Sequence, residues 1–171
     1  MNILVFTEGT VLMHALAKGV SREERVRQSQ NIITRLRATP GSVRDLESYI
    51  PVGNAIEKLK SWKQQGAKIV YLTSRRIKSE IEAIKKVLSK NNFPNWQNLY
   101  FRKRRENYKD IAERLTPDVL IEDDCESIGG EKEMVYPHIK KELKQKIKSV
   151  VIQEFEGVDN LPDDIILFKY K

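Results

Sequence analysis

The stretch ILVFTEGT, residues 3–10, decides the fold class of this 171-residue chain. Four consecutive apolar residues are followed at once by polar residues and a glycine, which is typical of a short buried strand that ends in a tight turn. A strand without alternation between apolar and polar residues is covered on both of its faces. We therefore expect this strand to belong to a buried parallel sheet.

The same pattern recurs along the chain. Short apolar runs that are typical of strands lie at residues 69–72, 99–101, 119–121 and 150–152. Between them, apolar residues recur at helical spacing over residues 55–62, 81–88, 108–115 and 137–147. Strands that alternate with amphipathic helices predict an α/β fold, with a doubly wound and mostly parallel sheet that has helices on both faces.

The segment from residue 12 to residue 50 is more polar than the rest and interrupts this alternation. A capping box, Ser21 with Glu24 three residues later, predicts the start of a helix. The apolar side of that helix would comprise Val26, Ile32, Ile33 and Leu36. We predict a single domain over residues 1–171, with residues 12–50 as a small helical cap inserted after the first strand.

Charge and composition restrict the class of protein. The chain has 31 Lys+Arg against 24 Asp+Glu, a formal net charge of +7, which favours anionic partners. The apolar runs are too short to cross a bilayer, and the N-terminus lacks the pattern of a secretory signal. Because Cys125 is the lone cysteine, an internal disulfide is excluded. We expect a cytoplasmic protein without membrane contact.

Polar side chains follow the first, second and fourth predicted strands. Glu8 follows the first strand, Thr73 and Ser74 the second, and the acidic run Glu122-Asp123-Asp124 the fourth, while Lys109 lies near the helix after the third. Ligands of such sheets bind at the carboxyl ends of the strands. Mg²⁺ prefers carboxylate oxygens, and hydroxyl groups and lysine hold phosphate oxygens. We predict phosphate ligands at Thr73, Ser74 and Lys109, and a metal site at the acidic run.

The order of these elements resembles the haloacid dehalogenase-like (HAD) phosphohydrolase superfamily. Its first motif is a strand followed by Asp-x-Asp-Gly-Thr. Gly9 and Thr10 align with the last two positions, so Phe6 falls on the first Asp and Glu8 on the second. The fold that this resemblance implies is the Rossmann-like sheet of that superfamily.

The other three motifs follow in the same order. Thr73 matches the Thr or Ser of the second motif, Lys109 or else Lys103 the lysine of the third, and residues 122–124 the acidic pair of the last. The phrases YLTSR and LIED, at residues 71–75 and 120–123, resemble nucleotidase-type and uncharacterised microbial HAD-like proteins. The resemblance extends from Met1 to about Ile128.

Phe6 departs from the family at its central position. In the superfamily the first Asp attacks phosphorus and the second is the general acid and base. Phe6 has no lone pair for attack on phosphorus and binds no metal, and loss of a covalent nucleophile costs many powers of ten in rate. The resemblance therefore implies that Glu8 and Asp123 are the remaining catalytic candidates.

Three interpretations follow. The main prediction is a protein of phosphohydrolase ancestry that binds phosphate, a nucleotide or a metal, with weak or no standard phosphatase activity and a small phosphorylated molecule as its partner. The second is an active Mg²⁺-dependent hydrolase in which metal-bound water replaces the nucleophile. The third is a scaffold or nucleic-acid-binding module, whose basic face would comprise Arg75, Arg76, residues 102–105 and a helix over Lys140–Lys148.

Overall fold

The computed structural model describes residues 1–31 and 39–169. Its main sheet consists of β1 (Asn2–Phe6), β4 (Lys68–Leu72), β5 (Leu99–Tyr100), β6 (Val119–Asp123) and β7 (Lys148–Ile152). These strands lie in the order β5-β4-β1-β6-β7, and each neighbouring pair is parallel. The predicted α/β fold class, with a mostly parallel sheet between helices, is therefore confirmed.

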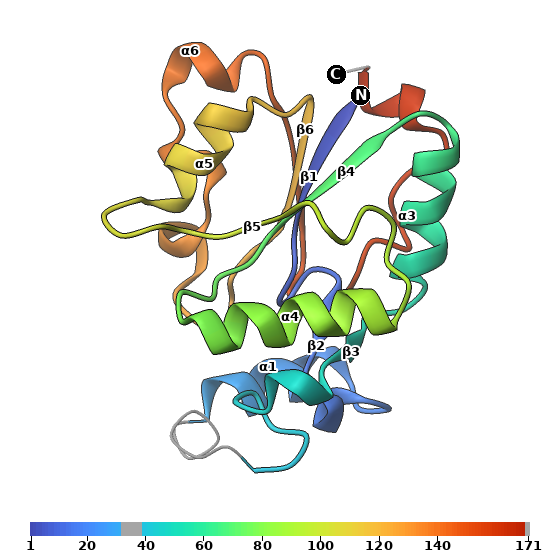
Figure 1. Ribbon diagram of the computed structural model, residues 1–171, viewed down its shortest axis with the longest axis vertical. Helices are drawn as coiled ribbons and strands as arrows, with labels where there is room; N and C mark the ends of the chain where they lie inside the picture. The colour runs from blue at the N-terminus through green and yellow to red at the C-terminus, as the bar shows by residue number, and fades with distance from the viewer. Residues whose placement is uncertain (32–38, 170–171) are drawn as a thin grey trace.

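Helices cover both faces of this sheet (Figure 1). They are α3 (Ala55–Gln64), α4 (Lys78–Lys90), α5 (Tyr108–Leu115) and the single turn α6 (Lys141–Lys144). Ile3 and Val5 of β1 belong to the core cluster that contains the apolar sides of α3 and α4. Leu4 belongs to a second cluster on the other face, with the apolar residues of α5. The uninterrupted apolar run of β1 thus supplies both layers of the core, because successive side chains point to opposite faces.

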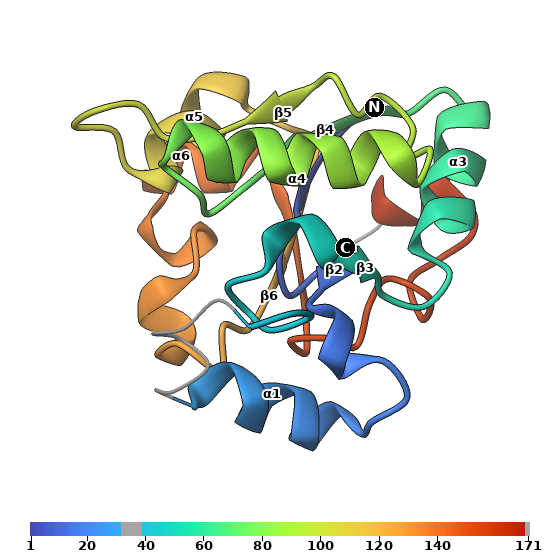
Figure 2. The same ribbon diagram turned by 60° about the horizontal axis from the view of Figure 1, so that its bottom comes forward.

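The inserted segment lies beyond the carboxyl ends of the strands (Figures 1 and 2). Its elements are β2 (Leu12–Met13), η1 (Ala15–Ala17), α1 (Arg22–Gln30), η2 (Leu46–Ser48) and β3 (Ile50–Pro51), with β2 and β3 antiparallel. Helix α1 begins after Ser21, whose Oγ accepts a hydrogen bond from the Glu24 backbone N–H. Three residues assigned to its apolar side, Ile32, Ile33 and Leu36, lie outside the described residues. The role of the segment as a cap stays a prediction.

The predicted helix over residues 137–147 is wrong. The chain forms two short pieces there, η4 (Tyr136–His138) and α6, separated by Ile139 and Lys140, neither of which is helical. Ile139 and Ile147 are both buried, but they follow two separate short helical pieces. Their helical spacing therefore does not reflect one helix. Because β7 begins at Lys148, the continuous cationic helix assigned to nucleic-acid binding is absent from this described stretch.

Short 3₁₀ segments complete the described chain. They are η3 (Gly130–Glu133) after β6 and η5 (Ile165–Lys169) near the C-terminus. Trp62 of α3 packs edge-to-face on Phe168 of η5, which anchors the C-terminal segment to this helix. Among the described residues, no helix combines the length and the apolar character that a membrane crossing requires.

Candidate functional site

The carboxylate of Glu8 lies among hydrogen-bond donors at the ends of β1 and β4. Its Oε1 accepts from Thr73 Oγ1 at 2.6 Å and from Arg75 Nε at 3.1 Å. Its Oε2 accepts from Thr7 Oγ1 at 2.6 Å and from the Ser74 backbone N–H at 3.1 Å. We call these four donors the Glu8 cradle. Two hydroxyls, a backbone amide and a guanidinium are the groups with which proteins bind oxyanions.

The register of the sheet brings the cradle together. β1 and β4 pair with Phe6 opposite Leu72, so Thr7 and Thr73 are the next residues on adjacent parallel strands. The Thr7 backbone N–H donates to the Leu72 carbonyl at 3.1 Å and holds the two ends in line. Thr73 Oγ1 also accepts from the Arg75 backbone N–H at 3.2 Å, which turns the chain back toward Glu8.

The cradle keeps Glu8 ionised. Burial opposes the charged form, but the Arg75 guanidinium and the hydrogen bonds from Thr7, Thr73 and Ser74 outweigh it and hold the pKa of Glu8 below its ordinary value. The pKa of Arg75 is raised: burial opposes its charge, but the Glu8 carboxylate outweighs that effect. At neutral pH Glu8 is therefore a fixed anion and a poor proton donor.

Asp123, at the end of β6, faces the turn that follows β1. Its Oδ2 accepts from Thr10 Oγ1 at 2.8 Å, and its Oδ1 accepts from the Cys125 backbone N–H at 3.0 Å. Burial raises the pKa of Asp123 to about 6. A Cβ atom on Gly9 would lie 2.7 Å from Oδ2 of Asp123, and Gly9 has a φ of +82°. Both features require glycine at this position. Because glycine has no Cβ atom, the turn can approach the carboxylate closely.

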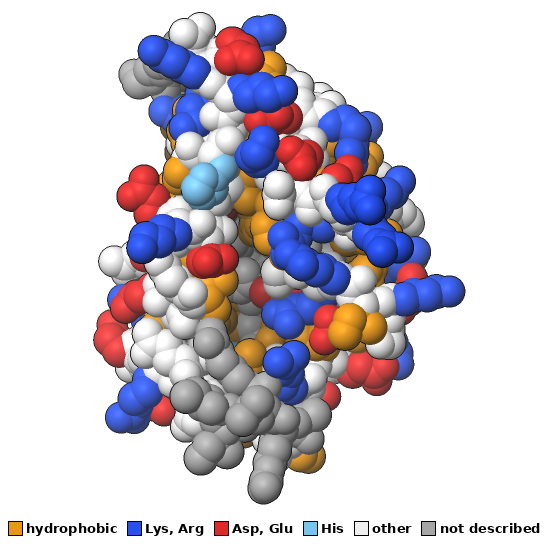
Figure 3. Space-filling view, turned by 90° about the vertical axis from the view of Figure 1, so that its left-hand side faces the viewer, with side chains coloured by type: hydrophobic (Ala, Val, Ile, Leu, Met, Phe, Trp, Pro, Cys, Tyr) orange, Lys and Arg blue, Asp and Glu red, His pale blue; other side chains and the backbone are white. Residues whose placement is uncertain are grey.

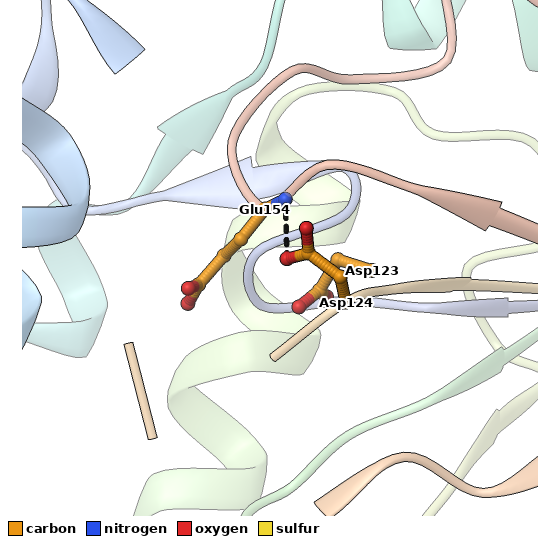
Figure 4. A group of neighbouring side chains, drawn as sticks. All are labelled: Asp123, Asp124 and Glu154. Atoms are coloured by element: carbon orange, nitrogen blue, oxygen red, sulfur yellow. Dashed lines mark hydrogen bonds between the residues drawn. The ribbon is translucent and has the colours of Figure 1, made fainter. Parts of the chain in front are cut away.

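Three carboxylates form an acidic group at the ends of β6 and β7 (Figure 4). Asp123, Asp124 and Glu154 each offer an oxygen, and these atoms all lie within 4.8 Å of one another. The Glu154 backbone N–H donates to Asp124 Oδ1 at 3.1 Å, which joins the two strand ends. Burial raises the pKa of Glu154 to about 7, although Ser127 donates two hydrogen bonds to its carboxylate. Carboxylate oxygens are the ligands that a hard divalent cation such as Mg²⁺ takes, so this group is the candidate metal site.

Glu122 does not join the acidic group. Side chains alternate along β6, so Glu122 points to the opposite face of the sheet from Asp123. There its carboxylate accepts from the backbone N–H groups of Val135 at 2.6 Å and Tyr136 at 2.9 Å. Burial raises its pKa. Glu154 thus takes the place that the sequence analysis gave to Glu122, whose bonds hold the loop after β6.

Neither candidate lysine is a hydrogen-bond partner of the cradle. Lys109 Nζ pairs with Asp110 at 3.3 Å and with Glu113 at 3.8 Å, both on its own helix. The side chain of Lys103 is exposed. Of the described residues, the cation bound to Glu8 is Arg75, and neither lysine hydrogen-bonds to Glu8 or Asp123. Thr73 and Ser74, in contrast, both donate to Glu8, and their role as phosphate ligands stays a prediction.

Phe6 presents a ring at the position that the resemblance gives to a nucleophile. The ring packs edge-to-face on Tyr108, with centroids 6.0 Å apart, and adjoins the apolar cluster under α5. This contact is apolar, so the side chain offers neither a nucleophile nor a metal ligand.

Sequence reasoning missed three residues of the site: Arg75, Thr10 and Glu154. Arg75 directly follows Thr73-Ser74, and Thr10 closes the first motif. Glu154 lies two residues after the end of β7. The rule that polar residues at strand ends converge would have identified Glu154 if it had been applied to the last strand as well.

The comparison with solved structures agrees with this fold, and two other comparisons found no match. No family model and no curated protein match the chain. Among solved structures, it is similar to the class C acid phosphatase from Bacillus anthracis, a HAD-superfamily member whose crystal structure holds tungstate. The two share 13% sequence identity and a TM-score of 0.51, over 98% of this chain and 76% of that one. At this identity the likeness shows a common fold.

Proposed function

We propose that this chain is a HAD-like protein of phosphohydrolase ancestry that binds a divalent metal ion and a small phosphorylated molecule, and that does not hydrolyse phosphate esters through a covalent intermediate. One observation carries the proposal. The carboxylate of Glu8 fills the Glu8 cradle, with all four donors directed to its two oxygens. The four donors are suited to an oxyanion, but the anion that they bind is the carboxylate of Glu8.

The chemistry of the cradle supports loss of turnover. A phosphate would have to displace a carboxylate that Arg75 holds by charge, and it would meet Phe6 where attack on phosphorus requires a nucleophile. The lowered pKa of Glu8 also makes it a poor general acid. Each feature alone slows hydrolysis, and together they remove the covalent route.

The acidic group supports the metal part of the proposal. Asp123, Asp124 and Glu154 would hold the ion, and Mg²⁺ bound there would supply positive charge that polarises a phosphoryl oxygen. The carboxylates repel one another, as their coulombic effect on the pKa of Glu154 indicates. A bound cation would relieve this repulsion.

One observation favours a second function, that of an active Mg²⁺-dependent hydrolase without a covalent intermediate. Without a bound ion, burial raises the pKa of Asp123 to about 6, so a carboxylate oxygen that does not hold the metal could accept a proton near neutral pH. Asp123 lies beside Thr10 and the turn after β1, at the same edge of the sheet as the cradle.

A test of the two functions measures phosphate release from a panel of phosphate monoesters, in Mg²⁺ and in EDTA. The proteins are the wild type, Asp123→Asn, and the double variant Phe6→Asp/Glu8→Asp. Aspartate at position 8 is one methylene shorter and withdraws from Arg75. We expect no turnover by the wild type and a gain by the double variant. Mg²⁺-dependent turnover by the wild type that Asp123→Asn abolishes would overturn the proposal in favour of the hydrolase.

A further inference from the structure

A second site lies beside the cradle, in a cavity of about 370 Å³ that we call the lateral pocket. Four cationic side chains line it, Arg76, Arg102, Lys109 and Lys132, against the single carboxylate of Glu133. Figure 3 shows this face of the molecule, where Lys and Arg side chains gather along a hollow in the surface. The excess of positive charge around a concave surface favours an anionic ligand.

Arg102 is held in place and keeps a donor free. Its guanidinium stacks on the Tyr108 ring, 3.6 Å from the centroid, and its Nη2 donates to the Tyr108 hydroxyl at 2.8 Å. The Nε–H of Arg102 is buried without a hydrogen-bond partner among the described residues. A buried donor without an acceptor is costly, so an acceptor that reached this guanidinium would be favoured.

The lateral pocket is separate from the Glu8 cradle. The peptide groups of Ser74 lie between them: its N–H donates to Glu8 Oε2, and its carbonyl accepts from the Tyr108 hydroxyl at 2.7 Å. Tyr108 lines the pocket, whereas Glu8 and Asp123 do not. A ligand can therefore enter the pocket without displacing Glu8 from the cradle.

Charge and size identify the class of ligand. Arg76 and Lys132 make no ion pair with any described residue, so their charges are available, whereas Asp110 and Glu113 partly neutralise Lys109. Arginine and lysine together suit phosphate oxygens, to which the guanidinium binds in a bidentate manner. The volume falls within the range of small-molecule sites, about 300–1,000 Å³.

We propose that the lateral pocket binds the phosphate groups of a small phosphorylated molecule, in place of the cradle that Glu8 occupies. The proposal rests on the proposed function, from which it takes the class of ligand, and adds where that ligand binds. Arg76, Lys132 and the Arg102 guanidinium, which Tyr108 holds in place, are its recognition groups.

The test measures binding of inorganic pyrophosphate to the full chain by calorimetry in EDTA, which keeps metal out of the acidic group. The variants are Arg76→Gln and Lys132→Gln, and the matched control is Arg104→Gln, an exposed cation of the same basic run that does not line the pocket. We expect each pocket variant to weaken binding roughly tenfold or more, as loss of a charge-assisted hydrogen bond does. The control should bind like the wild type.

Two results would overturn the inference, and they are distinguishable. If the wild type binds pyrophosphate and both pocket variants bind it equally well, the inference fails while the proposed function stands. If the wild type does not bind pyrophosphate, the inference fails, and a mixed-sequence oligonucleotide then tests whether this basic surface binds nucleic acid instead. Oligonucleotide binding that Arg104→Gln weakens as much as Arg76→Gln would identify an extended nucleic-acid surface, and both the inference and the proposed ligand class would fail.

Discussion

The side chains of Glu8 and Arg75 form an ion pair, with 3.1 Å between Oε1 and Nε, at the carboxyl ends of two neighbouring strands. Their exposed fractions are 11% and 20%, so the pair is largely shielded from water. The pair belongs to the Glu8 cradle, in which all four donors are directed to the carboxylate of Glu8. The ion pair is thus both a structural element and the reason that we expect the cradle to be closed to an external anion.

Removal of the Glu8 charge should destabilise the protein. Glu8→Gln leaves Arg75 without its partner, and breaking a buried ion pair costs about 3–5 kcal/mol. Because the folded-state pKa of Glu8 lies below 4.5, its contribution to stability is fully present above pH 4.5 and is lost as the pH falls through the lowered value. Urea unfolding between pH 3 and pH 7, roughly the range over which carboxylates titrate, measures both effects.

The control for this prediction is Glu142→Gln, which removes an exposed carboxylate from α6. It should change the free energy of unfolding by less than about 0.5 kcal/mol. The difference between wild type and Glu8→Gln should shrink in acid. A difference that stays constant down to pH 3, or that is absent at pH 7, contradicts the ion pair as described.

Gly9→Ala should destabilise the protein by more than its backbone strain alone. The added Cβ would lie 2.7 Å from Asp123 Oδ2, so the turn and the carboxylate must separate. Gly19→Ala is the matched control, because Gly19 has a similar φ of +75° and no atom within 4 Å of the added Cβ. We expect about 1 kcal/mol for the control and at least about 1 kcal/mol more for Gly9→Ala. Equal losses in urea unfolding would show that Gly9 does not pack on Asp123.

Magnesium binding should depend on residues that follow two different strands. Asp124→Asn and Glu154→Gln each remove one carboxylate from the acidic group. We expect either change to weaken Mg²⁺ binding by roughly tenfold or more, since loss of even an outer partner of a metal site costs about 10–100-fold. Calorimetric titration measures the affinity, with Glu142→Gln as the control. Unchanged affinity in both variants would exclude this metal site.

Glu122 should behave differently from its neighbours. Glu122→Ala leaves the backbone N–H groups of Val135 and Tyr136 without their acceptor, which should cost about 2–4 kcal/mol of stability. Its affinity for Mg²⁺ should match that of the wild type, because its carboxylate lies on the other face of the sheet. A variant that keeps its stability but loses Mg²⁺ would place Glu122 in the metal site after all.

The sequence predicted the sheet because its signals are local. The apolar run of β1 and the runs that became β4, β6 and β7 are each short, continuous and followed by polar residues. The helix predicted over residues 137–147 failed because Ile139 and Ile147 are buried by tertiary packing, and this burial imitates helical spacing. Periodicity records which side chains are buried and does not show that one helix buries them.

The site was predictable in its location and less so in its contacts. The positions after the predicted strands placed four residues at the same edge of the sheet: Glu8, Thr73, Ser74 and Asp123. The ion pair of Glu8 with Arg75 depends on how a turn after β4 directs a long side chain, which no spacing rule specifies. The exchange of Glu122 for Glu154 follows from strand alternation and from the pairing of β6 with β7, which only the three-dimensional fold reveals.

The central claim is that Glu8 occupies the place of a bound oxyanion. The most direct measurement is the anomalous density of tungstate in crystals of the wild type and of Glu8→Ala, soaked under the same conditions. We predict tungstate on Thr73, Ser74 and Arg75 in Glu8→Ala, and the Glu8 carboxylate on the same donors in the wild type. Tungstate in the cradle of the wild type, with Glu8 turned away from Arg75, would contradict the account.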